Sequence, residues 1–79
     1  MTSKNSLMIA IRTVMAMNNE RNKFMSDMAE VSHAIDVLTQ AIKDGNTLDT
    51  WCWCTILNTE TERMMKSMKA YTDALNRGE

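Results

Sequence analysis

Apolar residues recur along the first half of the chain at alternating spacings of four and three residues. Stepping in this way from Leu7 reaches Leu7, Ala10, Val14, Met17, Arg21, Phe24, Met28, Val31, Ile35, Leu38 and Ile42. Arg21 is the only charged residue in this series. Because such a spacing keeps side chains on one side of a helix and is typical of coiled-coil packing, it predicts a long helix over about residues 4–44.

A weaker apolar stripe follows in the second half of the chain. Its positions are Cys54, Leu57, Thr61, Met64, Met68, Tyr71 and Leu75, with Trp51 and Met65 beside them. Thr61 and the nearby Asn58 interrupt its apolar character. Gly45 can take the left-handed conformation that ends a helix, and Thr47 is the expected N-cap of the next one. The pattern therefore predicts a turn at residues 45–46 and a helix over about residues 48–76.

These elements predict an all-α fold, a single domain built as a long helical hairpin. The composition agrees, since proline is absent and glycine occurs only at Gly45 and Gly78. Two interpretations remain open at Asn18 and Asn19. The first helix continues or merely kinks there, or the two asparagines end one helix and cap another, which makes a three-helix chain.

The two arms of the hairpin have unequal lengths. Folding at the turn leaves the beginning of the first helix overhanging by about 10 to 15 Å, at about 1.5 Å per residue. This overhang is apolar around most of its circumference, which is typical of an interface. We expect either a second protomer or a third helix to cover it. Its apolar residues are Leu7, Met8, Ile9, Ile11, Val14 and Met15.

Charge is unevenly distributed although the net charge is only −1. Residues 1–23 carry +3, residues 24–62 carry −6, and residues 63–79 carry +2. In a hairpin, both basic segments lie at the open end and the acidic segment lies at the turn. Two hairpins with their turns at opposite ends would place unlike charges together, which predicts an antiparallel dimer forming a four-helix bundle. The expected interface residues are Leu7, Ile11, Val14, Met15, Phe24 and Met28.

This predicted arrangement resembles small plasmid-borne hairpin regulators of the Rop type, which pair as antiparallel four-helix bundles. The resemblance is architectural, and no motif here carries the RNA-binding residues of that family. Hairpin subunits and co-chaperones of bacterial secretion systems are similar at the same coarse level. Architecture of this kind implies no function by itself.

No recognisable catalytic arrangement occurs in the sequence. Cys52 and Cys54 point about 200° apart on a helix, so they cannot grip one metal ion. His33 has no local serine, cysteine or carboxylate arrangement that forms a recognisable catalytic set. The sequence therefore predicts no enzyme, metal, cofactor or small-molecule substrate. Residues 7–17 are too short for a membrane span and are interrupted by Arg12, so we expect a cytoplasmic protein with reduced thiols.

The remaining signals favour a protein that binds another protein. Methionines and tryptophans can form an adaptable binding surface, and the expected partner surface consists of Trp51, Trp53, Met64, Met65 and Met68. The same side chains can also simply fill a dimer core. RNA binding is the alternative, through the basic positions Arg63, Lys66 and Lys69. A third hypothesis treats residues 7–17 as a helix lying on a membrane surface.

Overall fold

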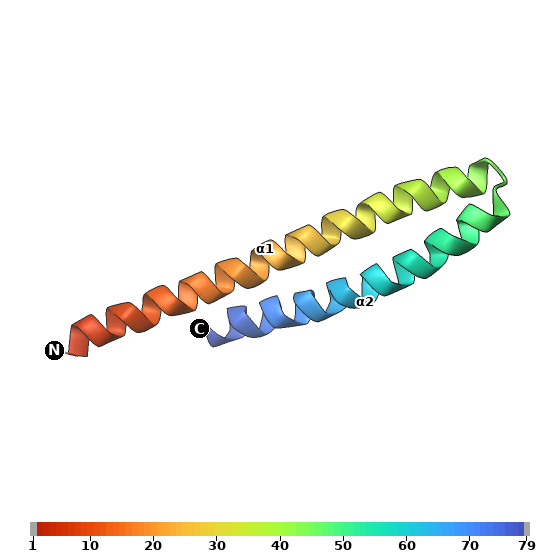
Figure 1. Ribbon diagram of the computed structural model, residues 1–79. Coiled ribbons are helices and arrows are strands. Elements are labelled where there is room, and N and C mark those ends of the chain that lie inside the picture. The colour runs from red at the N-terminus through yellow and green to blue at the C-terminus, as the bar shows by residue number, and fades with distance from the viewer. Residues whose placement is uncertain (1, 79) are drawn as a thin grey trace.

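The computed structural model describes residues 2–78, and they form two antiparallel helices. Helix α1 spans Thr2–Lys43 and helix α2 spans Thr47–Arg77, with no strand in the described part of the chain. The hairpin is long and thin, with extents of 67 × 14 × 13 Å (Figure 1). The predicted all-α helical hairpin is confirmed.

Helix α1 passes through Asn18 and Asn19 as continuous α-helix. The three-helix alternative is therefore wrong, as is the expectation that residues 7–17 could fold back. Asparagine lowers helix propensity only modestly, and neither proline nor glycine interrupts this segment. The N-terminal end of α1 consequently projects beyond the end of α2 (Figure 1).

The turn is built around Gly45 and Asn46, which have distinct roles. Gly45 has φ +69°, and its N–H donates to the carbonyl of Ile42 at 3.1 Å. The N–H of Asn46 donates to the carbonyl of Ala41 at 3.0 Å, which completes a glycine-based helix end. The predicted N-cap at Thr47 is wrong by one residue. Asn46 is the cap, because its extended backbone lets Oδ1 accept a hydrogen bond from the N–H of Asp49 at 3.0 Å.

The helices touch along a row of small or polar residues. Ala34, Ser67 and Ala74 are almost completely inaccessible, at 0%, 2% and 2% exposed. Such short side chains let two helix backbones approach closely. Buried positions in α1 recur at the same alternating spacing as the apolar stripe, but only Val31 belongs to both sets. The buried row consists of Asp27, Val31, Ala34 and Ala41 in α1 and of Ser67 and Ala74 in α2. We call the seam the buried or half-buried positions that recur every seven residues, which are Thr13, Glu20, Asp27, Ala34 and Ala41 in α1 and Trp53, Glu60, Ser67 and Ala74 in α2.

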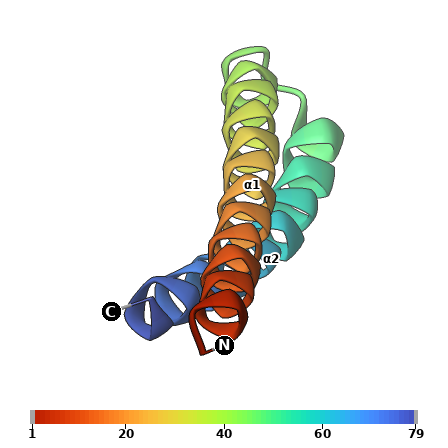
Figure 2. The same ribbon diagram turned by 90° about the vertical axis from the view of Figure 1, so that its left-hand side faces the viewer.

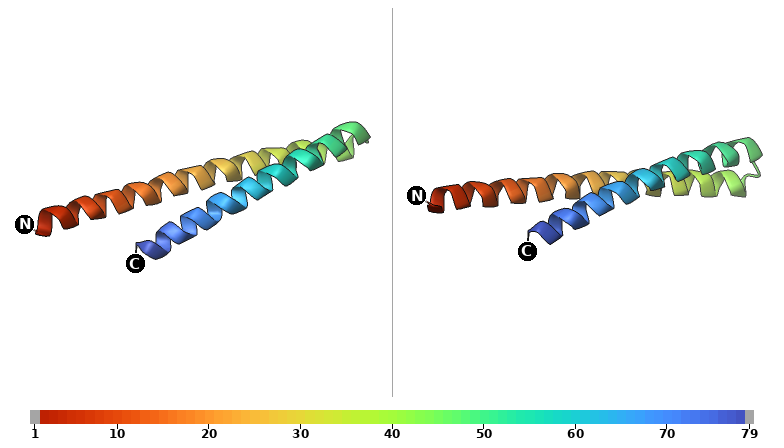
Figure 3. Two further views of the ribbon diagram at one scale, coloured as in Figure 1. Left: turned by 60° about the horizontal axis from the view of Figure 1, so that its bottom comes forward. Right: turned by 90° about the horizontal axis from the view of Figure 1, so that it is seen from below.

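Two contacts define the register between the helices. The rings of Phe24 and Tyr71 lie with their centroids 6.1 Å apart, and Arg63 bonds to Glu30 across the hairpin. Asp27 is midway along the sequence between Phe24 and Glu30, and Ser67 is midway between their partners Arg63 and Tyr71. Asp27 and Ser67 therefore lie at the same height in the hairpin. The helices also wind round each other, so that α2 begins on one side of α1 and ends on the other (Figures 2 and 3).

The apolar stripe of α1 faces its neighbour only in part, contrary to the simplest coiled-coil expectation. From Met17 onward, every second member of the stripe is buried or half-buried, as at Met17, Phe24 and Val31. The members between them are exposed. With 3.6 residues per turn, the centre of the stripe is rotated by about 50° from the direction of α2. The exposed members are Leu7, Ala10, Val14, Arg21, Met28, Ile35 and Ile42.

Candidate interaction face

The hairpin has two long sides, and an ion pair marks one of them. Arg63 Nη1 donates to Glu30 Oε2 at 3.2 Å on this side. Both residues lie three positions after a seam residue, Asp27 in α1 and Glu60 in α2. Other residues with this relation to the seam share the side, which we call the ion-pair face. It consists of Ala16, Lys23, Glu30, Val37, Asp44, Asp49, Ile56, Arg63, Ala70 and Arg77.

The opposite side is predominantly apolar. Its residues follow directly after a seam residue, as Met28 follows Asp27 and Met68 follows Ser67. In an antiparallel helix pair, this relation places the residues of both helices on the same side of the seam. The large hydrophobic residues among them are substantially exposed, from 39% at Met28 to 61% at Leu7. We call this side the apolar face, and it consists of Leu7, Val14, Arg21, Met28, Ile35, Ile42, Cys54, Thr61, Met68 and Leu75.

Larger apolar side chains lie between the two rows of the apolar face. They are half-buried rather than buried, because the small seam residues behind them already bring the helices together. A hairpin alone therefore leaves their outer surfaces in water. These half-buried residues are Met17, Phe24, Leu38, Leu57, Met64 and Tyr71.

An open hollow indents the apolar face in the half nearest the turn. Leu38 from α1 and Trp51 from α2 contribute to it, and Trp51 is 68% exposed. Trp53 differs, since it is half-buried and meets the ring of His33 edge-on, with centroids 6.1 Å apart. The residues lining the hollow are Leu38, Trp51, Cys54, Thr55, Leu57, Asn58 and Thr61.

The residues predicted for protein contacts are distributed over both environments. Met64 belongs to the half-buried interior, like Trp53, whereas Met65 and Met68 are exposed. Among the predicted dimer residues, Phe24 is engaged with Tyr71 inside the hairpin. The others are exposed, and the apolar face brings together Leu7, Val14 and Met28, while Ile11 and Met15 lie further round α1.

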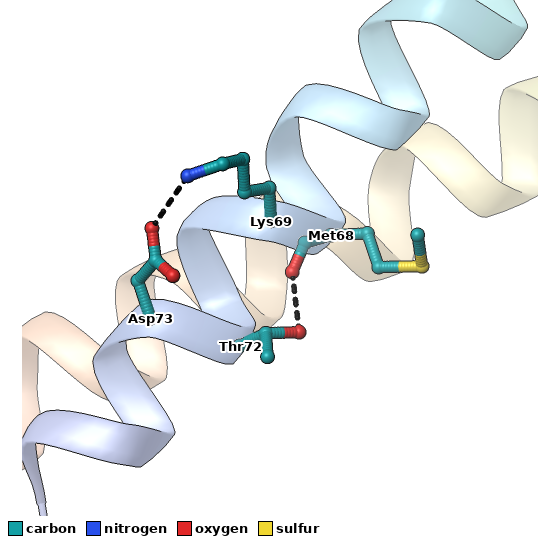
Figure 4. A network of polar contacts seen from close by, with 4 residues as sticks. All are labelled: Met68, Lys69, Thr72 and Asp73. Atoms are coloured by element: carbon teal, nitrogen blue, oxygen red, sulfur yellow. Dashed lines mark hydrogen bonds and ion pairs between the residues drawn. The ribbon is translucent and has the colours of Figure 1, made fainter.

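The predicted basic strip is partly neutralised within the hairpin. Arg63 pairs with Glu30, and Lys69 Nζ lies 3.2 Å from Asp73 Oδ2 one turn later. Lys66 forms no ion pair within the described part of the chain. In Figure 4 the side chain of Met68 extends away from the Lys69–Asp73 pair, so this methionine and the ion pair occupy different sides of α2.

Two buried carboxyl oxygens in the seam were not anticipated from the sequence. Asp27 is 7% exposed, and its Oδ2 has no hydrogen-bond partner within the hairpin. Oε2 of Glu60 is likewise buried and unpaired. The signal that could have revealed them is the seven-residue spacing of Asp27, Ala34 and Ala41. Their small side chains allow a closer helix contact than the larger side chains of the apolar stripe do.

Comparison with known proteins yields no relative, because no protein-family model, curated protein or solved structure matches the chain. Within residues 2–78, no group of three or more histidine, cysteine, aspartate or glutamate residues is placed to hold a metal ion. None of the helices described here is long and apolar enough to cross a membrane. Cys52 and Cys54 are both exposed and unbridged.

Proposed function

We propose that this protein is a non-enzymatic helical adaptor or regulator that acts by binding protein, and that its first partner is a second copy of itself. In this proposal, two hairpins pack through their apolar faces, with their turns at opposite ends, into a four-helix bundle. The observation that carries it is the apolar face, which runs along both helices while the other side carries the inter-helix ion pair.

The direction of the apolar stripes supports a four-helix arrangement over an isolated pair. In a bundle of four helices arranged in a square, the direction from one helix to the centre of the core differs by about 45° from the direction to either adjacent helix. The stripe of α1 is rotated from α2 by about 50°, and that of α2 is rotated toward the same side. Phe24, Met64 and Tyr71 would thus become core residues, although a single hairpin only half-buries them.

The overhang of α1 supports a second copy as the occupant. Leu7 and Val14 continue the apolar face along the part of α1 that projects beyond the end of α2, and among the described residues they are left 61% and 54% exposed. A second hairpin of opposite direction would place its turn end beside this overhang. Charge favours that orientation, because residues 1–23 carry +3 and the turn end belongs to a segment that carries −6.

The proposal is tested by measuring solution mass with multi-angle light scattering over a dilution series. The full chain is expected to be a dimer, and Ile35→Asp is expected to be a helical monomer, because it buries a charge in the bundle core. Ile56→Asp provides the matched control, since Ile56 is also exposed but lies on the ion-pair face. Circular dichroism verifies that each variant remains helical.

A wild-type chain that stays monomeric at high concentration would overturn the proposal. The same holds if Ile35→Asp and Ile56→Asp weaken the dimer equally, because the apolar face would then have no special role. Loss of the dimer in Ile35→Asp alone, with helicity retained in both variants, would support it.

A further inference from the structure

Two polar positions interrupt the apolar face, one on each helix. Arg21 interrupts the row on α1, and it makes neither a hydrogen bond nor an ion pair with any described residue. Thr61 interrupts the row on α2 and lines the hollow together with Asn58. The two positions lie at different heights in one hairpin, since Arg21 is near the open end and Thr61 is nearer the turn.

The hydroxyl group of Thr61 differs from those of most other threonines in the chain. Six threonine hydroxyls donate to the carbonyl four residues earlier, which satisfies them within their own helix. Thr61 forms no such bond in the described structure although it is half-buried. Its hydroxyl is therefore available to another group on the apolar face. The six satisfied threonines are Thr13, Thr39, Thr50, Thr55, Thr59 and Thr72.

An antiparallel dimer can bring these polar positions together in one register. If the two-fold axis passes beside Met28, each residue before Met28 in one copy lies level with the residue of the other copy that is equally far after Met28. Arg21, one heptad before Met28, then lies level with the partner copy of Ile35, one heptad after it. The contacts of Phe24 with Tyr71 and of Glu30 with Arg63 place Thr61 close to the height of Ile35.

The same register also covers Val14, at the inner end of the apolar overhang. Val14 and Ile42 lie two heptads before and after Met28, so each would face the other residue in the second copy. Both are more than half exposed in a single hairpin, at 54% and 59%. Arg21 would thus meet the polar Thr61 near the height of Ile35, and the apolar Val14 would meet the apolar Ile42.

We propose that the guanidinium of Arg21 in each protomer donates hydrogen bonds to Thr61 Oγ1 and to the side-chain oxygen of Asn58 in the other protomer. These two symmetric polar layers set the register of the dimer, with Met28 at the two-fold axis. The inference rests on the proposed homodimer and adds the residues that align it. A buried polar group in a bundle commonly specifies register at a cost in stability.

Disulfide formation between identical cysteines tests the position of the axis. In a Cys52→Ser, Cys54→Ser background, Met28→Cys is expected to cross-link to its own copy under air oxidation, because a disulfide needs Cα atoms within about 7 Å. Ile35→Cys is the control one heptad away. Its two copies would be about 20 Å apart at 1.5 Å per residue, so its cross-linked fraction is expected to be about tenfold lower.

The role of Arg21 is tested by repeating the cross-linking with Arg21→Leu and with Thr61→Val. Either change removes one partner of the polar layer, so other registers become populated. The cross-linked fraction is then expected to fall in Met28→Cys and to rise in Ile35→Cys. Arg21→Lys, which keeps a donor and the charge, is expected to retain more of the preference for Met28→Cys. An unchanged pattern in Arg21→Leu and Thr61→Val would overturn the assignment.

Light scattering on the same samples separates this inference from the proposed function. A dimer that cross-links through Ile35→Cys more than through Met28→Cys would overturn the register while the homodimer stands. A monomer in the absence of oxidant would overturn both.

Discussion

Arg63 on α2 donates a hydrogen bond to Glu30 on α1 at 3.2 Å, and within residues 2–78 this is the only ion pair that joins the two helices. Their side chains are 53% and 48% exposed. The pair identifies the polar side of the hairpin and its register. Because water screens both groups, it is expected to contribute little to stability.

Removing this ion pair is the first prediction. Arg63→Met and Glu30→Gln are each expected to change the free energy of unfolding by about 1 kcal/mol or less, because exposed pairs contribute about 0–1 kcal/mol. Urea denaturation followed by circular dichroism, at one fixed protein concentration, provides the measurement. A double-mutant cycle with a coupling energy above about 2 kcal/mol would contradict the surface character of the pair.

A larger side chain at Ala34 is expected to separate the helices. Ala34 is 0% exposed at the close contact, so Ala34→Leu should lower the free energy of unfolding by about 1–3 kcal/mol through overpacking. Ala29 is exposed on the same helix and provides the control, since Ala29→Leu should change stability by less than about 0.5 kcal/mol. Equal melting temperatures for the two variants would show that the seam is misplaced.

Asp27→Ala is expected to stabilise the protein. The carboxylate is 7% exposed and its Oδ2 has no hydrogen-bond partner within the hairpin, so replacing it with a small apolar group removes a desolvation cost of about 1–3 kcal/mol. Asp36→Ala removes an exposed carboxylate on α1 and should have a much smaller effect. Thermal unfolding at matched concentration compares them, and a lower melting temperature for Asp27→Ala would mean that Asp27 has a partner in the assembled protein.

The turn provides a fourth prediction through its glycine. Gly45→Ala is expected to cost about 1–2 kcal/mol, since φ is +69° and an L-residue is disfavoured there. No atom lies within 4 Å of the added Cβ, so the cost would come from the backbone rather than from a clash.

Gly78→Ala is the comparison, because Gly78 has an ordinary φ of −75°. A Cβ on Gly78 would lie 3.1 Å from Sδ of Met17, whose flexible side chain can move aside. Similar losses for both variants in urea denaturation would exclude backbone strain as the reason.

Much of the fold followed from local sequence signals. The alternating spacing from Leu7 to Ile42 predicted a long first helix, and Gly45 predicted its end, because both effects depend on neighbours in the chain. The cap was placed at Thr47 instead of Asn46, since both side chains can accept a hydrogen bond from a helix N-terminus. Only backbone geometry distinguishes them.

The candidate interaction face was only partly predictable. Leu7, Val14 and Met28 were expected at an interface from the apolar overhang and stripe, and the structure places all three on the apolar face. The assignment of Trp53 to an outer surface could not anticipate its contact with His33. That contact depends on which side of α2 turns toward α1, and local periodicity does not contain this information.

By itself, the sequence determined the helices, the turn and the apolar stripe along each helix, because local propensity and periodicity specify them. The tertiary structure decided which residues of each helix meet. Helix backbones approach most closely where side chains are small, so Ala34, Ser67 and Ala74 form the seam. The larger residues of the stripes are consequently turned to one side, where a single hairpin leaves them half in water.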